Sequence, residues 1–163
     1  MAYKKLYLQA GFSLIETGIV VAVFSVLIGI ATINLLGSKQ KANVAGTVTL
    51  VVSDIKQQQT KAMTLTTQSG VTADYGIYFT PENYVLFKGT YSPDDANNFV
   101  VAYGENITAS VSALPTNTIL FSRQTGEVSN FDSSKNTLQL INSVTNEKKT
   151  IRINRYGVIT QAN

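Results

Sequence analysis

Hydrophobic residues are concentrated in one uninterrupted stretch near the N-terminus. From Thr17 to Ser38 the chain carries no charged residue. The apolar centre of this stretch, Gly18 to Leu36, is long enough as a helix to cross a bilayer, at a rise of roughly 1.5 Å per residue. The pattern therefore predicts a transmembrane helix over residues 12–38.

The segment that follows, residues 38–65, contains no proline and repeats apolar residues at helical spacing. Intervals of three and four residues are typical of a helix with one buried face. The positions expected on that face are Val44, Val48, Val51, Val52, Ile55, Ala62 and Met63. The positions expected on the opposite face are Lys41, Thr49, Lys56, Gln57 and Lys61. We expect one helix from near Leu14 to about Thr66, with its second half packed on a globular head.

From Tyr75 onward the pattern changes to short runs rich in β-branched and aromatic residues, separated by turn-forming residues. The expected strands are residues 75–79, 84–88, 99–103, 107–111, 118–122, 138–142 and 149–155. About seven or eight strands at this spacing predict two packed antiparallel sheets. The expected fold is therefore α+β, with a globular head over residues 39–163 that includes the amphipathic half of the helix.

Composition narrows the chemistry that this chain can perform. Its 163 residues include no Cys and no His. The absence of Cys excludes disulfides and thiolate nucleophiles, and the absence of His removes the commonest general base and every Ser-His-Asp triad. No phosphate-binding loop and no pair of carboxylates stands out. We expect a structural or binding protein that is not an enzyme and needs no cofactor.

The formal net charge of +3 is set largely at the N-terminus. Without Lys4 and Lys5, 11 basic side chains remain against 10 acidic ones. A basic flank before an apolar stretch is also the pattern of a secretory signal, but this stretch exceeds the roughly 7–15 residues usual there and has no clear A-x-A cleavage site. A plain single-span anchor is the other alternative. Both alternatives leave Glu16, at the edge of the stretch, unexplained.

The residues at this boundary are GFSLIE, at positions 11–16. Between the basic flank and the apolar stretch, they resemble the processing signal of type IV pilins and pseudopilins. The resemblance implies that a prepilin peptidase removes the leader, residues 1–11, by cleaving between Gly11 and Phe12. It also implies that the same enzyme N-methylates Phe12 and that residues 12–38 later form a helix in the filament core.

Both the energetic cost of a charge in an apolar segment and the family resemblance point to a functional role for Glu16. A lone ionised carboxylate at membrane depth is costly, and such residues are usually functional. Cleavage after Gly11 would create an amine at Phe12, about one helical turn away. The resemblance implies that Glu16 acts in assembly by pairing with this amine on a neighbouring subunit. The alternative is a cap on the amine of its own chain.

Two segments of the head, residues 119–128 and 150–159, form a phenylalanine-then-glycine hairpin and a closing strand with a Gly-Val turn. They resemble the GspH/FimT-like group of minor type IV pilins and type II secretion pseudopilins. This implies a structural subunit of a pilus or pseudopilus, at the tip or in assembly priming. The implied partners are other pilin or pseudopilin subunits, the prepilin peptidase and the inner-membrane assembly platform. The implied location is the bacterial inner membrane as a single-pass precursor, then a cell-surface pilus or a periplasmic pseudopilus.

Four basic residues lie close together near the C-terminus: Lys148, Lys149, Arg152 and Arg155. Strand periodicity places Lys148 and Arg152 on one face. Some minor pilins of this group bind DNA during uptake, so DNA is an alternative partner for this cluster. The other interpretation is a solvated edge strand that its charges protect.

One loop offers oxygen atoms that suit a hard cation. Asp94, Asp95, Asn97 and Asn98 follow Pro93 closely. Carboxylate and amide oxygens are ligands that calcium prefers, and a calcium site occurs in some pseudopilins. The alternative is a polar turn without metal. Apart from this loop, we expect no metal site.

Overall fold

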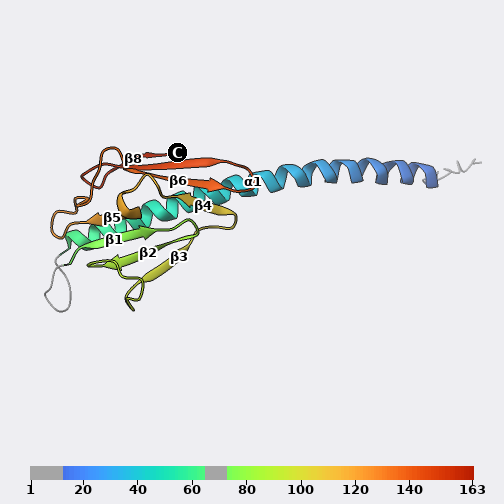
Figure 1. The fold of residues 1–163 in the computed structure, drawn as a ribbon. Coiled ribbons are helices and arrows are strands. Elements are labelled where there is room, and N and C mark those ends of the chain that lie inside the picture. The colour runs from blue at the N-terminus through green and yellow to red at the C-terminus, as the bar shows by residue number, and fades with distance from the viewer. Residues whose placement is uncertain (1–12, 65–72) are drawn as a thin grey trace, which may run out of the picture. The chain divides into compact units, whose positions relative to one another are not determined.

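The computed structural model describes residues 13–64 and 73–163, and over residues 30–42 it describes the backbone without the side chains. The chain divides into two compact units, residues 1–38 and residues 39–163. Helix α1, Leu14–Met63, belongs to both units (Figure 1). The described part of the chain contains this helix, a short 3-10 helix and eight strands.

In the first unit, the described residues form the beginning of α1, which confirms the helix start expected near Leu14. The helix ends at Met63, and the expected end at Thr66 lies outside the described residues. No helix in the described part of the chain combines the length and the apolar character needed to cross a membrane. The membrane span expected over residues 12–38 stays a prediction.

The second unit contains two four-stranded antiparallel sheets, which confirms the expected α+β fold. The first sheet has the order β3-β2-β1-β5, and the second has the order β4-β6-β7-β8. The strands of the first sheet are β1 Tyr75–Phe79, β2 Asn83–Lys88, β3 Phe99–Ala102 and β5 Thr118–Phe121. Those of the second are β4 Ile107–Ser110, β6 Thr137–Asn142, β7 Lys148–Ile153 and β8 Ile159–Ala162, and the 3-10 helix η1 is Pro115–Asn117.

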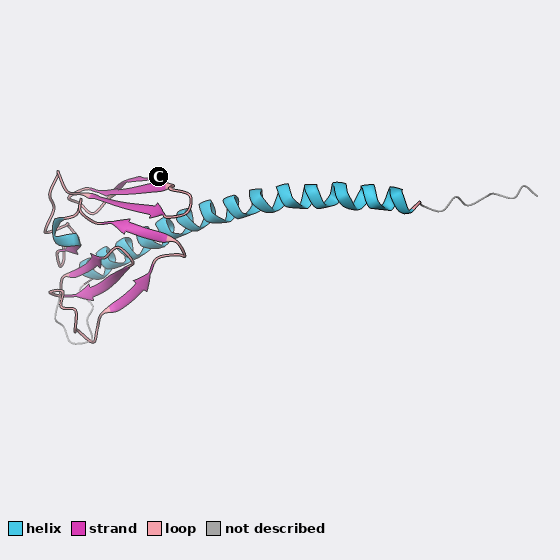
Figure 2. Ribbon diagram, turned by 45° about the vertical axis from the view of Figure 1, so that its right-hand side comes forward, coloured by secondary structure: helices cyan, strands magenta, loops and turns pink. Residues whose placement is uncertain are grey.

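The second half of α1 supplies the centre of the head core. Figure 2 shows the strands of the two sheets on either side of it. Val44, Val51 and Ile55 are fully buried, as the helical spacing predicts, and aromatic residues of the first sheet, such as Phe79, join the same cluster. One expectation was wrong: Met63 is 49% exposed. In the last turn of the helix Ala62 takes the buried position, and the next residue points about 100° away from it.

The position of β7 corrects a second expectation. β7 is hydrogen-bonded to β6 on one side and to β8 on the other, so it is not an edge strand. The edge belongs to β8, whose four residues, ITQA, did not stand out as a strand in the sequence. The charges on β7 therefore do not protect an open edge.

Candidate functional site

The start of α1 is stabilised by Ser13. The backbone N–H of Glu16 donates to Ser13 Oγ at 3.2 Å, and the backbone N–H of Thr17 donates to the Ser13 carbonyl at 3.1 Å. Serine at the N-cap with glutamate three residues later is the sequence of a capping box. A carboxylate in the first turn also interacts favourably with the helix dipole. Glu16 thus has a local role in starting the helix, whatever else it does, and its side chain is exposed.

Large apolar side chains cover all sides of the helix around and after Glu16. Their exposed fractions range from 45% to 92% for Leu14, Ile15, Ile19, Val20, Val21, Val23, Phe24, Val26, Leu27 and Ile28. A helix that is apolar all round is normally buried in its working state, and exposed apolar patches of this kind mark membrane or protein contacts. This surface is the strongest functional feature of the first unit.

The polar side chains of the same segment turn back to the helix backbone. The hydroxyl of Thr17 donates to the Ser13 carbonyl at 3.3 Å, and the hydroxyl of Ser25 donates to the Val21 carbonyl at 2.9 Å. Such local bonds satisfy a hydroxyl without water. The segment is therefore suited to apolar surroundings even at its hydroxyl-bearing positions.

The expected processing site precedes the described part of α1 in the sequence. Gly11 and Phe12 both lie outside the described residues. Cleavage between them and methylation of Phe12 stay predictions from the sequence. The described helix begins two residues after Phe12, at Leu14.

The four basic residues of the C-terminal cluster do not act alike. Lys148 and Arg152 are exposed on the outer face of β7, as predicted. Lys149 pairs with Glu147 at 3.6 Å, and Arg155, which follows the strand, pairs with Glu127 at 3.6 Å. The residues opposite Arg152 on the flanking strands are uncharged: Thr137 and Gln161. The structure thus brings two of the four cations together on one polar face.

The loop before β3 holds Asp94 and Asp95 in a turn closed by its own hydrogen bonds. Asp95 Oδ1 accepts both the backbone N–H and the side-chain amide of Asn97 at 2.9 Å each, and these bonds hold the pKa of Asp95 below its ordinary value. Asn98 donates to the Ser92 carbonyl at 2.7 Å. Within residues 13–64 and 73–163, no group of three or more His, Cys, Asp or Glu side chains is placed to hold a metal ion.

The two head segments that carry the family resemblance meet on α1. Gln59 Nε2 donates to the carbonyls of Gly126 and Tyr156, both at 2.9 Å. Gly126 and Gly157 have positive φ angles of 67° and 75°, where glycine is favoured. A Cβ on Gly126 would lie 2.6 Å from the Met63 side chain, and one on Gly157 would collide with the Gln59 amide.

A backbone bond strengthens this docking. The N–H of Gln124, in the loop after β5, donates to the Ala62 carbonyl at 2.9 Å. Carbonyls in the last turn of a helix lack partners within the helix. The loop therefore caps the C-terminal end of α1. The residue types of this loop do not predict that contact.

Two polar residues of α1, Asp54 and Gln58, make hydrogen bonds to the first sheet that the sequence pattern did not indicate. Tyr84 donates its hydroxyl to Asp54 Oδ2 at 2.5 Å, and burial together with this bond raises the pKa of Tyr84. Gln58 is 2% exposed and donates to the Gly76 carbonyl at 3.0 Å. The sequence could have predicted the burial of Gln58, because this residue lies three positions after Ile55 and four before Ala62, on the buried face of the helix.

Comparison with known proteins adds no assignment to these features. No family model, no curated protein and no solved structure matches the chain.

Proposed function

We propose that this chain is a minor type IV pilin or pseudopilin of the GspH/FimT-like kind, a structural subunit that enters a filament through the N-terminal part of α1. The observation that carries the proposal is the apolar surface around Glu16, where ten large side chains are exposed over residues 14–28. The hydrophobic effect favours covering such a surface with lipid or with other subunits.

In this role the apolar segment of the first unit lies first in the inner membrane and later in the filament core. As a single-pass precursor, the chain holds this segment in the inner membrane, with the basic flank of Lys4 and Lys5 on the cytoplasmic side. After the peptidase removes residues 1–11, the same side chains pack against neighbouring subunits in the filament core. The assembly platform transfers the subunit from one environment to the other.

Glu16 gives this transfer its specificity. A lone carboxylate among apolar side chains is unfavourable unless it is paired. The amine created at Phe12 of a neighbouring subunit is the complementary charge, and pairing neutralises both groups. The capping bond to Ser13 uses only the backbone N–H of Glu16, so the carboxylate remains available for that partner.

The head supports a structural role because it has a core of its own. Every member of the buried cluster lies between Val44 and Ile153, within the second unit. The head therefore does not depend on the exposed apolar residues of the first unit for its packing. It is suited to prime, cap or decorate a cell-surface pilus or a periplasmic pseudopilus.

The direct test is the N-terminus of the assembled protein. The chain is expressed in a bacterium with a prepilin peptidase and an assembly platform, and sheared filaments are analysed by mass spectrometry. The expected chain begins at methylated Phe12. Gly11→Leu should accumulate as an uncleaved precursor, whereas the control Ala2→Leu should be processed normally. A wild-type chain that begins at Met1 in filaments would refute the assignment.

A second candidate function is DNA capture by the head. The exposed position of Lys148 and Arg152 on one face, with the uncharged Thr137 and Gln161 opposite Arg152, favours it. Each phosphate contact releases counterions, so affinity falls with salt. A gel shift at several salt concentrations should show weaker binding and a shallower salt slope for the double variant Lys148→Gln/Arg152→Gln. Arg155→Gln, whose side chain pairs with Glu127, is the matched control. Binding that is absent at physiological salt leaves the head purely structural.

A further inference from the structure

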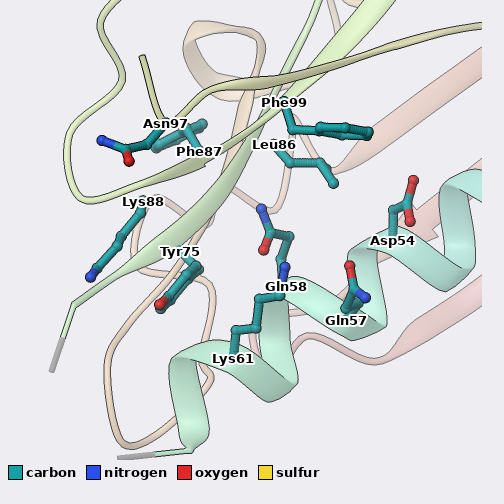
Figure 3. A pocket seen from close by; sticks show the side chains of 10 residues that line it. All are labelled: Asp54, Gln57, Gln58, Lys61, Tyr75, Leu86, Phe87, Lys88, Asn97 and Phe99. Carbon is teal, nitrogen blue, oxygen red and sulfur yellow. The ribbon is translucent and has the colours of Figure 1, made fainter. Parts of the chain in front are cut away.

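A pocket of about 390 Å³ opens in the head between the second half of α1 and the first sheet. Figure 3 shows the side chains that line it, from the helix below and from the strands and the loop before β3 above. All of these residues belong to the second unit. The volume falls within the range of small-molecule sites, which is roughly 300–1,000 Å³.

The lining contains an amide that lacks half of its hydrogen bonds. Gln58 Nε2 donates to the Gly76 carbonyl, but among the described residues Gln58 Oε1 has no partner, although the side chain is 2% exposed. Buried polar atoms are nearly always paired. Gln58 and Lys61, one turn later on the same helix, both line the pocket. Gln58 Oε1 is therefore a hydrogen-bond acceptor without a donor among the described residues.

Charge in the pocket favours an anion at one end. Lys61 of α1 and Lys88 at the end of β2 both line it, and both are exposed. Neither lysine forms a salt bridge within the described residues. Figure 3 shows Tyr75 between these two lysines and Asp54 at the opposite end, and the Asp54 carboxylate already accepts the Tyr84 hydroxyl.

The remaining lining residues are those that suit a sugar ring. Phe99 presents an aromatic ring at the pocket with 65% of the residue exposed. Aromatic faces offer a large apolar surface against which the C–H groups of a sugar can pack. Gln57 and Asn97 add two further amides, and each amide both donates and accepts hydrogen bonds, as ring hydroxyls require.

We propose that this pocket binds an acidic saccharide, a sugar whose ring carries a carboxylate. The carboxylate lies at the end of the pocket where Lys61 and Lys88 flank Tyr75, and one face of the ring packs on Phe99. A ring hydroxyl donates to Gln58 Oε1, which is buried in the free protein and which binding uncovers. The binding is independent of the filament role, because the whole site lies in the head.

The test uses the full-length chain in detergent micelles and isothermal titration calorimetry with digalacturonate. Its neutral counterpart, digalactose, should bind at least about fivefold more weakly, because the carboxylate contacts are lost. Lys61→Gln and Lys88→Gln should each weaken digalacturonate binding about fivefold. Lys56→Gln, which removes an exposed lysine of the same helix outside the pocket, should bind like the wild type.

Phe99→Ala tests the stacking surface at an exposed position, where folding is not at risk. It should weaken binding of digalacturonate and leave the thermal unfolding midpoint unchanged. Inorganic phosphate and acetate test for capture of any small anion. Phosphate or acetate binding as tightly as digalacturonate would overturn the proposal. Wild-type affinity in both lysine variants, or no binding of digalacturonate, would overturn it as well.

Discussion

The docking of two loops on Gln59 can be tested by removing one side chain. In Gln59→Ala the helix keeps a good helix former, so the change acts through lost contacts and not through backbone propensity. The two hydrogen bonds to Gly126 and Tyr156, both at 2.9 Å, disappear together. The segments that carry the family resemblance then lose their shared attachment to α1.

The magnitude follows from the surroundings of these bonds. A typical hydrogen bond contributes about 1 kcal/mol net to stability. The bond to Tyr156 is exposed and the one to Gly126 is partly buried, so water can replace part of the loss. We expect the free energy of unfolding to fall by about 1–2 kcal/mol. For a domain of this size the unfolding midpoint should fall by roughly 3–8 °C.

The assay is thermal unfolding followed by circular dichroism, with the full chain in detergent micelles. Gln57→Ala is the matched control, because this glutamine is exposed on the same helix and the structure shows no side-chain hydrogen bond for it among the described residues. The control should change stability by less than about 0.5 kcal/mol. If Gln59→Ala is no less stable than Gln57→Ala, the two loops do not depend on this amide and the reasoning is refuted.

Three further results are expected. Glu16→Ala should be inserted and cleaved normally but enter sheared filaments poorly, because loss of one partner of a buried charge pair is unfavourable by about 3–5 kcal/mol; an unchanged ratio to wild type would leave Glu16 as a capping residue only. Deletion of residues 1–38 should give a soluble, mainly β protein by circular dichroism, and an aggregated product would mean that the apolar segment contributes to the head core. Burial raises the pKa of Tyr84 and of Tyr103 above the ordinary 10.0. Stability should therefore be complete below about pH 10 and fall as the pH rises further, and Tyr84→Phe should flatten this fall in melts between about pH 8 and 11.

The sequence by itself determined the elements of this protein. Helical spacing predicted the buried positions Val44, Val51 and Ile55, and β-branched runs predicted seven of the eight strands in the described residues. These features are local, because side-chain periodicity reports which face of a helix or strand is buried. The boundary motif at residues 11–16 is equally local, and the proposed function depends on it.

Tertiary structure decided the order of the strands and the contacts between distant elements. Strand order made β7 an inner strand and left the edge to β8, an arrangement that no single segment encodes. Packing also made Gln59, which resembles an ordinary surface residue in the sequence, the attachment point of two distant loops. It buried Gln58 with a side-chain oxygen that has no partner among the residues that the structure describes. Such contacts join residues up to 97 positions apart, so they exist only after the helix and both sheets have packed around one core.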